Sequence, residues 1–196
     1  MSLNLLTLLC SLPVITAGPA FCALFSAMLK IVLNESGEPI PSFFSAFKNN
    51  FRNGLLLGLI GVFGAAVVFS DGVYAFSVTG TAKTVFCIVT GIVAAIWLTY
   101  ICYAFALQAR FENGVISHIK NAFLLAFINP GKTVLMWVIL LIPVLLLLYL
   151  PRYVVAYIGV LYLMFGISLP VFCLSLVLKD VFAGLEERKK DSSAAK

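Results

Sequence analysis

The stretch TVFCIVTGIVAAIWLTYICYAFAL, from Thr84 to Leu107, decides the fold class of this chain. It contains no charged side chain. At a helical rise of about 1.5 Å per residue, it is long enough to cross the roughly 30 Å hydrocarbon layer of a membrane. A backbone inside lipid must satisfy its own polar groups, and a helix does so within one segment. This stretch therefore predicts a transmembrane helix.

Three further stretches share this apolar character: Gly54 to Ser70, Thr133 to Leu150 and Val154 to Leu178. The chain is 62% hydrophobic and 11% charged, whereas a soluble domain is roughly half apolar and about a quarter charged. The expected connections are Asp71 to Lys83, the polar stretch Gln108 to Lys132, and the tight turn Pro151-Arg152-Tyr153. We therefore predict an all-α fold, a polytopic transmembrane helix bundle of about five crossings, with short amphipathic cytoplasmic helices.

No long polar linker divides the apolar runs, so we expect one transmembrane domain over residues 1–180. The polar tail over residues 181–196 mixes acidic and basic side chains and is predicted to be disordered. The start Met1-Ser2-Leu3-Asn4 carries no basic side chain, so we expect the first apolar stretch to be retained and not cleaved as a signal peptide. The cysteines lie in apolar stretches without C-x-x-C spacing and are interpreted as small buried residues: Cys10, Cys22, Cys87, Cys102 and Cys173.

The basic residues predict how the chain is oriented in the membrane. Lys and Arg concentrate in the cytoplasmic loops of membrane proteins. Of the 13 Lys and Arg residues, only Lys83 and Arg152 fall on the side opposite the others. The C-terminus is therefore predicted to be cytoplasmic. The net charge of +5 is spread over several short segments, which favours membrane orientation over nucleic-acid binding as its explanation.

The N-terminal stretch from Leu3 to Leu33 is apolar but interrupted, first by Pro13 and then by Thr16-Ala17-Gly18-Pro19. Proline removes a helical hydrogen bond and clashes with the preceding turn, so we expect a kink or break at Gly18-Pro19. The hydroxyl of Thr16 is expected to repair backbone groups freed there. The stretch forms either one broken crossing or a hairpin, which would raise the count to six crossings.

An internal repeat bears on this choice. AFKNNFRNG, from Ala46 to Gly54, matches AFLLAFINP, from Ala122 to Pro130, at an offset of 76 residues (122 minus 46). Both copies lead into a predicted span. A weaker echo relates PAFC at Pro19 to PVFC at Pro170, each followed by an apolar stretch that ends in Leu-Lys. If the offset is structural, it favours one broken first crossing with the N-terminus outside.

The first copy of the repeat lies within an expected amphipathic helix at the membrane interface. Phe43, Phe47 and Phe51 recur at helical spacing, with Phe44 beside them, while Lys48 falls toward the other side. The aromatic face is expected to enter the headgroup region or dock on another protein, and Lys48 to meet anionic lipid. The bland alternative is a helix that only caps the bundle. The second copy is less polar and is expected to lie deeper or to pack on the bundle.

Four glycines recur along one side of the second crossing: Gly54, Gly58, Gly61 and Gly64. Small residues let two helix backbones approach closely in a membrane. We interpret this stripe as a static packing surface, with a gliding contact for a moving helix as the less favoured alternative.

Signatures of chemistry are missing from the sequence. The four clear spans hold no carboxylate, histidine or charge pair of the kind that marks ion-coupled transport. The only histidine, His118, is interpreted with Glu112 and Lys120 as solvated loop surface. No H-E-x-x-H, G-x-S-x-G or phosphate-binding loop occurs. We therefore expect no enzymatic activity, no cofactor and no metal site.

Two segments together resemble a known family. The first reads L-P-x-x-T-x-G-P-A and includes Pro13, Thr16, Gly18 and Pro19; the second reads F-F-x-x-F-K-x-N-F. They are similar to the YesL-like family of bacterial integral membrane proteins, a domain of unknown function numbered 624, and the resemblance covers nearly the whole chain. The candidate motif or interaction residues are Pro13, Thr16, Gly18, Pro19, Phe43, Phe47, Lys48 and Phe51.

The resemblance implies a multi-pass protein of the bacterial cell membrane, associated with carbohydrate-uptake gene clusters that include importers driven by ATP hydrolysis. It supplies no activity. Family members typically start with a more polar, often basic segment, which is missing here and would favour a cytoplasmic start and a hairpin. The E-A-A-x-x-x-G signature of importer permease subunits is also missing.

Two functions follow as expectations. The first is a non-enzymatic accessory factor associated with carbohydrate uptake, whose partners are the lipid bilayer and a carbohydrate importer complex, with no nucleic acid. The alternative is a small permease for uncharged or sugar-derived solutes. A polar stripe shared by several crossings would favour the permease, and the sequence shows none.

Overall fold

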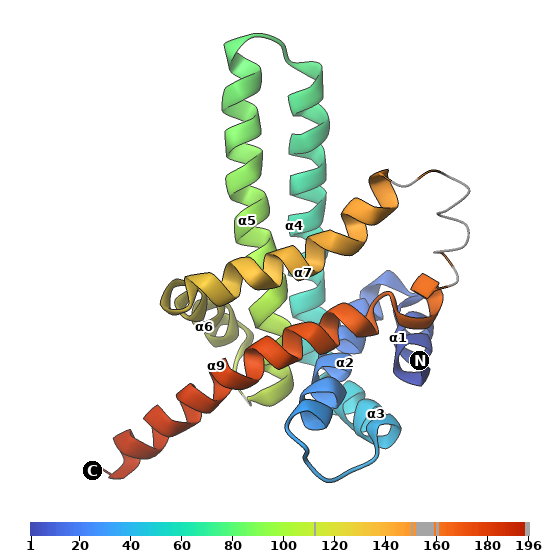
Figure 1. The fold of residues 1–196 in the computed structure, drawn as a ribbon, viewed down its shortest axis with the longest axis vertical. Helices are drawn as coiled ribbons and strands as arrows, with labels where there is room; N and C mark the ends of the chain where they lie inside the picture. The colour runs from blue at the N-terminus through green and yellow to red at the C-terminus, as the bar shows by residue number, and fades with distance from the viewer. Residues whose placement is uncertain (112, 150, 152–158, 160, 195–196) are drawn as a thin grey trace.

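Helices form the described part of the chain, residues 1–111, 113–149, 151, 159 and 161–194 of the computed structural model (Figure 1). They are α1 (Ser2–Ser11), the 3-10 helix η1 (Val14–Thr16), α2 (Ala17–Val32), α3 (Pro39–Asn49), α4 (Phe51–Ser77), α5 (Thr81–Arg110), α6 (Val115–Ile128), α7 (Pro130–Tyr149) and α9 (Ser168–Ala194). Both α3 and α7 begin at a proline, whose fixed φ suits a first helical turn. The predicted outer turn at Arg152 and Tyr153, and the span start at Val154, lie outside the described residues.

Four stretches are long and apolar enough to cross a membrane, which confirms the predicted all-α transmembrane fold. They are Val14–Val32, Phe51–Ala75, Thr81–Arg110 and Ser168–Leu185. The helices α6 and α7 provide a fifth crossing if this pair, bent by 108° at a short break, counts as one span. The described helices therefore agree with a count of about five.

The apolar helices diverge in direction. In Figure 1, α4 and α5 run side by side and project beyond the other helices, whereas α7 and α9 run across the view. Within the most apolar 18-residue window of each span, only 11% of the residues are buried for α4 and 17% for α5, against 56% for the span that contains α2. Because α2 also contacts α3, α4, α5 and α9, it forms the centre of the fold.

The N-terminal stretch contains one crossing, Val14–Val32, as the echo favoured, but the short helix α1 before it folds back instead of continuing the crossing. The short helix α1 contacts α3, which follows the far end of α2, so α1 runs back along α2. With 10 residues it is too short to add a sixth crossing. The break lies at Pro13 and η1, and the predicted break at Gly18-Pro19 is wrong. Pro19 is the third residue of α2. Backbone N–H groups in the first turn of a helix have no acceptor within the helix, so proline, which lacks this group, is tolerated there.

Two segments expected to be irregular are helical. The connection between α4 and α5 is Val78 to Gly80 instead of Asp71 to Lys83, because both helices extend beyond their predicted ends. Gly80 closes this turn at a φ of 75°, which glycine adopts without a steric penalty. The backbone of α9 continues to Ala194, through the tail predicted to be disordered. The tail is rich in Glu, Arg, Lys and Ala, which have high helix propensity, and this favours continuation of the helix despite the polarity of the segment.

The predicted last span is interrupted in the structure. Helical backbone ends at Phe165, and α9 begins at Ser168. A Cβ atom added to Gly166 would lie 2.5 Å from the Tyr162 carbonyl oxygen, so the turn requires glycine at this position. The apolar run therefore contains a break that its hydropathy did not reveal.

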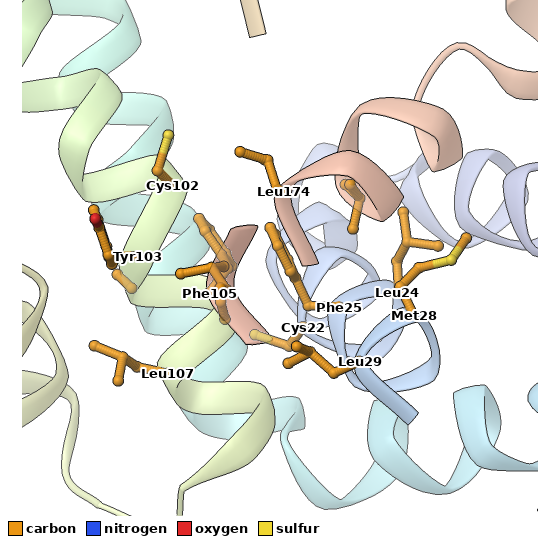
Figure 2. Packing of buried hydrophobic residues seen from close by; sticks show 14 of the residues in the cluster. Cys22, Leu24, Phe25, Met28, Leu29, Cys102, Tyr103, Phe105, Leu107 and Leu174 are labelled. Carbon is orange, nitrogen blue, oxygen red and sulfur yellow. The ribbon is translucent and has the colours of Figure 1, made fainter. Parts of the chain in front are cut away.

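The core lies where α2, α5 and α9 meet. Figure 2 shows buried side chains from these three helices gathered together, among them Phe25 and Leu29 of α2, Phe105 of α5 and Leu174 of α9. Small residues make this close packing possible, since much of α2 is alanine, glycine or cysteine. The fully buried small residues of α2 are Ala20, Cys22, Ala23 and Ala27.

Candidate functional site

The segment at Gly18 makes the tightest helix contact that the glycines reveal. A Cβ atom added to Gly18 would lie 2.0 Å from the carbonyl oxygen of Gly54 and 2.7 Å from the Cα of Gly58. A Cβ added to Gly54 would in turn lie 2.9 Å from the Cα of Pro19. Two features singled out in the sequence, the Gly18-Pro19 pair and the glycine stripe, are thus the two sides of one crossing between α2 and α4.

The other half of the stripe faces α5. The indole of Trp97 packs over Gly64 and donates a hydrogen bond from Nε1 to the Gly61 carbonyl oxygen at 2.8 Å. One turn along, the Tyr100 hydroxyl donates to the Leu57 carbonyl oxygen. Both bonds pin α5 to α4 through backbone acceptors, so the stripe forms a fixed packing surface, as predicted.

Thr16 stabilises the break between α1 and α2. Its hydroxyl oxygen lies 2.7 Å from the Cys10 carbonyl oxygen and 2.9 Å from the Pro13 carbonyl oxygen. These acceptors belong to the end of α1 and the break, where helical N–H donors are lacking. The prediction that this hydroxyl repairs freed backbone groups is confirmed.

The aromatic residues of α3 do not form one outward face. Phe43 is fully buried and stacks on half-buried Phe47, with ring centroids 6.4 Å apart. Phe44 and Phe51 are exposed, and so is Lys48. The predicted interfacial face is therefore wrong for Phe43, because α3 packs closely along α2 and uses this ring as its anchor.

The internal repeat corresponds to two similar helix pairs. In each, an amphipathic helix leads through a single asparagine into a long apolar helix, from α3 into α4 and from α6 into α7. The equivalent residues Ala46 and Ala122 are both buried. The matched residues Phe51 and Phe127 are both exposed, by 40% and 84%, although Phe51 begins α4 whereas Phe127 is in the last turn of α6. Each pair therefore turns an alanine to the core and a phenylalanine outward.

The bend between α6 and α7 is held by hydroxyl groups. The Thr133 hydroxyl oxygen lies 2.9 Å from the Asn129 carbonyl oxygen and 3.0 Å from the Tyr103 hydroxyl of α5. Thr133 and Tyr103 are both buried. This contact ties the 108° bend to the helix that carries the most buried polar groups.

A polar hollow of about 640 Å³ opens between the end of α2, α3, the start of α4 and the end of α5. Amide, hydroxyl and basic side chains dominate its lining: Ser26, Lys30, Ser42, Ser45, Asn49, Asn50, Asn53, Gln108, Arg110 and Asn113. Three further cavities in the described part of the chain are lined almost entirely by apolar side chains. Hydrogen-bonding groups that converge on a concave surface are the usual mark of a ligand site.

Several contacts shape this hollow. Gln108 Nε2 donates to Asn50 Oδ1 at 2.9 Å. Lys30 Nζ lies 3.4 Å from Ser42 Oγ. Arg110 forms an ion pair with Glu35, which closes the loop after α2 onto the end of α5. The hollow therefore brings two basic residues together, Lys30 from the end of α2 and Arg110 from the end of α5.

His118 is fully buried on α6, so its interpretation as loop surface is wrong. Neither ring nitrogen reaches a hydrogen-bond partner in the part of the chain that the structure describes. The residue lies on α6, one half of the bent helix pair that counts together as the fifth crossing. Lys120 is exposed as predicted, and Glu112 lies outside the described residues.

The cysteines are all free. Cys22 and Cys102 are buried as predicted, Cys10 and Cys173 are half-buried, and Cys87 is exposed on the projecting part of α5, where the prediction is wrong. Within the described residues, no three His, Cys, Asp or Glu side chains are grouped so that they could hold a metal ion.

Sequence reasoning missed two buried polar residues. Asn4 of α1 is fully buried, and its Oδ1 accepts hydrogen bonds from the backbone N–H groups of Ile167 at 3.0 Å and Ser168 at 2.8 Å. Its Nδ2 donates to the Leu163 carbonyl oxygen at 2.7 Å. Gln108, which the sequence assigned to a polar connection, is buried in the hollow. A lone amide at the edge of an apolar run was the only available signal in each case.

These features define the class of protein: a polytopic helical membrane protein with a polar hollow at the basic end of its helices. Residues 1–72 match the sequence model of a family described as "Protein of unknown function, DUF624". The matched region runs from α1 into α4 and includes both motifs on which the resemblance rests, so the resemblance to this family is confirmed there. No curated protein and no solved structure matches the chain.

Proposed function

We propose that this protein is a non-enzymatic accessory factor that binds another membrane protein. The observation that carries the proposal is the outward pair Phe51 and Phe127, which match in the sequence repeat and lie close to the junction of α3 with α4 and of α6 with α7. Exposed aromatic side chains on rigid helices are frequent anchors of protein interfaces. The partner that the family resemblance implies is a component of a carbohydrate importer.

We further propose a bacterial cell membrane as the location, with the C-terminus in the cytoplasm. Lys132 Nζ lies 3.9 Å from Asp180 Oδ2, so the start of α7 and the later part of α9 are at the same level. Lys30 at the end of α2 and Arg110 at the end of α5 line one hollow. An excess of Lys and Arg in these segments supports a cytoplasmic position for them.

The test is recovery of the partner by the tagged full-length chain from detergent extracts of its own cells. The wild type is expected to recover an importer component, and the double variant Phe51→Ala, Phe127→Ala to recover much less and to reduce cellular sugar uptake. The matched control is Phe63→Ala, Phe69→Ala, which removes two rings of α4 that are 72% and 73% exposed but lie outside the repeat. Recovery of no membrane partner, or equal recovery by both double variants, contradicts the proposal.

A transport assay separates this proposal from the permease alternative. The purified chain alone in liposomes is expected to give no solute flux above empty vesicles. The central cavity, about 270 Å³ between α2, α4, α5, α7 and α9, supports this expectation because its lining is almost entirely apolar. Flux of an uncharged or sugar-derived solute through the wild type would replace the accessory role with that of a permease.

A further inference from the structure

The polar hollow contains a buried amide with an unused acceptor. Gln108 is only 5% exposed and lines the hollow. Its Nε2 donates to Asn50, whereas its buried Oε1 has no hydrogen-bond partner among the residues that the structure describes. A buried acceptor without a donor is unfavourable, and such groups are normally satisfied by protein, water or a ligand. The floor of the hollow is therefore suited to a ligand that donates a hydrogen bond, such as a hydroxyl group.

The wall of the hollow supplies positive charge. Lys30 is half-buried, and its ammonium group makes one long contact, to the Ser42 hydroxyl at 3.4 Å. Two carboxylates belong to the loop between α2 and α3: Glu35, which is engaged by Arg110, and Glu38, the N-cap of α3; neither lines the hollow. The lining therefore favours an anionic group beside Lys30, with Ser and Asn side chains as further hydrogen-bond donors.

The position of the hollow at the ends of α4 and α5 indicates which class of anion it would meet. It lies at the ends of the long apolar helices α4 and α5, where the headgroup layer of a membrane would be. Phosphate is the anion that this layer presents, and amide and hydroxyl linings suit polyols. A phosphate ester that carries free hydroxyl groups combines both requirements in one molecule.

We propose that this hollow binds a polyol phosphate, with the phosphate beside Lys30 and a polyol hydroxyl donating to Gln108 Oε1. Two sources share this chemistry: the headgroup of a lipid such as phosphatidylglycerol, and a free polyol phosphate such as glycerol 3-phosphate. The site goes beyond the proposed accessory role and does not depend on it, because neither Phe51 nor Phe127 lines the hollow.

The experiment uses the full-length chain in neutral detergent and two probes. Calorimetry measures the binding of glycerol 3-phosphate, with glycerol and inorganic phosphate as comparisons. Native mass spectrometry measures lipid retained from nanodiscs of phosphatidylcholine mixed with phosphatidylglycerol. Preferential binding of soluble glycerol 3-phosphate identifies a free ligand, and selective retention of phosphatidylglycerol alone identifies a lipid headgroup.

Variants decide whether binding occurs in the hollow. Lys30→Met is expected to weaken binding of the active probe about tenfold, the usual effect of losing one charge-assisted contact. Lys48→Met is the matched control, because this lysine is exposed on α3 and does not line the hollow. Gln108→Met is expected to reduce the preference for glycerol 3-phosphate over inorganic phosphate, or for phosphatidylglycerol over an anionic lipid without a free hydroxyl.

Two results overturn the proposal. One is a wild-type protein that binds neither probe, a measurement that does not depend on the folding of any variant. The other is equal weakening by Lys30→Met and Lys48→Met, which would mean that general surface charge attracts the anion. The variants are compared only after size-exclusion chromatography shows the same elution as the wild type.

Discussion

The helices α2 and α5 are both apolar, yet α2 is largely buried at the centre of the protein and much of α5 is exposed. The most apolar 18-residue window of the span that contains α2 has a mean hydropathy of 1.7 and is 56% buried, whereas the corresponding window of α5 has a mean hydropathy of 2.3 and is 17% buried. The less apolar helix is thus the central one. Lipid tails are as apolar as leucine, so hydropathy does not drive one helix rather than another into the centre. Small residues and polar contacts do so instead.

The two halves of α5 repeat this comparison within one helix. Its buried residues all lie between Thr99 and Gln108, where α2 and α6 pack on it, while the half near Gly91 is exposed. The exposed half is no more polar than the buried one. The difference shows that the projecting end of the α4 and α5 hairpin is suited to lipid, and that the buried half belongs to the protein core.

The variant with the largest expected effect adds a side chain at the close contact between α2 and α4. Gly18→Leu is expected to destabilise the fold by more than about 3 kcal/mol, because the added atoms meet the backbone of α4 and neither helix can yield without separation. Gly91→Leu is the matched control on α5, since a Cβ there meets nothing within 4 Å. Denaturant unfolding of both variants in detergent measures the effect, and equal stability would show that the crossing is not formed.

A pair of truncations compares the packing of the two helices directly. Leu24→Ala on α2 is expected to cost about 3 kcal/mol, because the fully buried side chain leaves a cavity. Ile88→Ala on α5 is expected to change stability by less than about 0.5 kcal/mol, since this side chain is 58% exposed. The same unfolding assay applies. A similar loss from both variants would contradict the assignment of α2 as the central helix.

Removal of the Asn4 amide tests whether a polar contact holds α1 to the break before α9. Asn4→Leu is expected to cost about 2 kcal/mol, because it leaves two buried backbone N–H groups without their acceptor. Leu5→Ala on the exposed face of α1 should have little effect. Faster proteolysis near Gly166 in Asn4→Leu than in Leu5→Ala would locate the loss, and equal rates would argue against the contact.

The smallest expected effect concerns the contact between α4 and α5. Tyr100→Phe removes the hydroxyl that donates to the Leu57 carbonyl oxygen and is expected to cost about 1 kcal/mol, as single hydrogen bonds between membrane helices do. Tyr74→Phe, at a tyrosine that is 56% exposed, is the control and should be neutral. Thermal unfolding of the two variants is compared side by side. An unchanged stability of Tyr100→Phe would show that this hydrogen bond does not stabilise the fold.

Sequence patterns predicted the positions of the helices better than they predicted how the helices pack against one another. The span around Thr84 to Leu107 and the role of Thr16 could be read directly, because both depend on groups within one segment. The burial of Phe43 and His118 could not, because an amphipathic pattern does not say which of its faces meets the core. The polar hollow also escaped prediction, since its lining combines residues 26–53 with the distant residues 108–114.

By itself, the sequence determined that this protein is helical and membrane-embedded, because the free energy of placing an uncharged run in lipid depends on composition and length. It also determined where glycine permits close approach. Only the tertiary structure decided that Gly18 meets Gly54 and Gly58, that α1 turns back along α2, and that Gln108 and Lys30 share one hollow. Those outcomes depend on the shapes of several helices at once, which no single segment encodes.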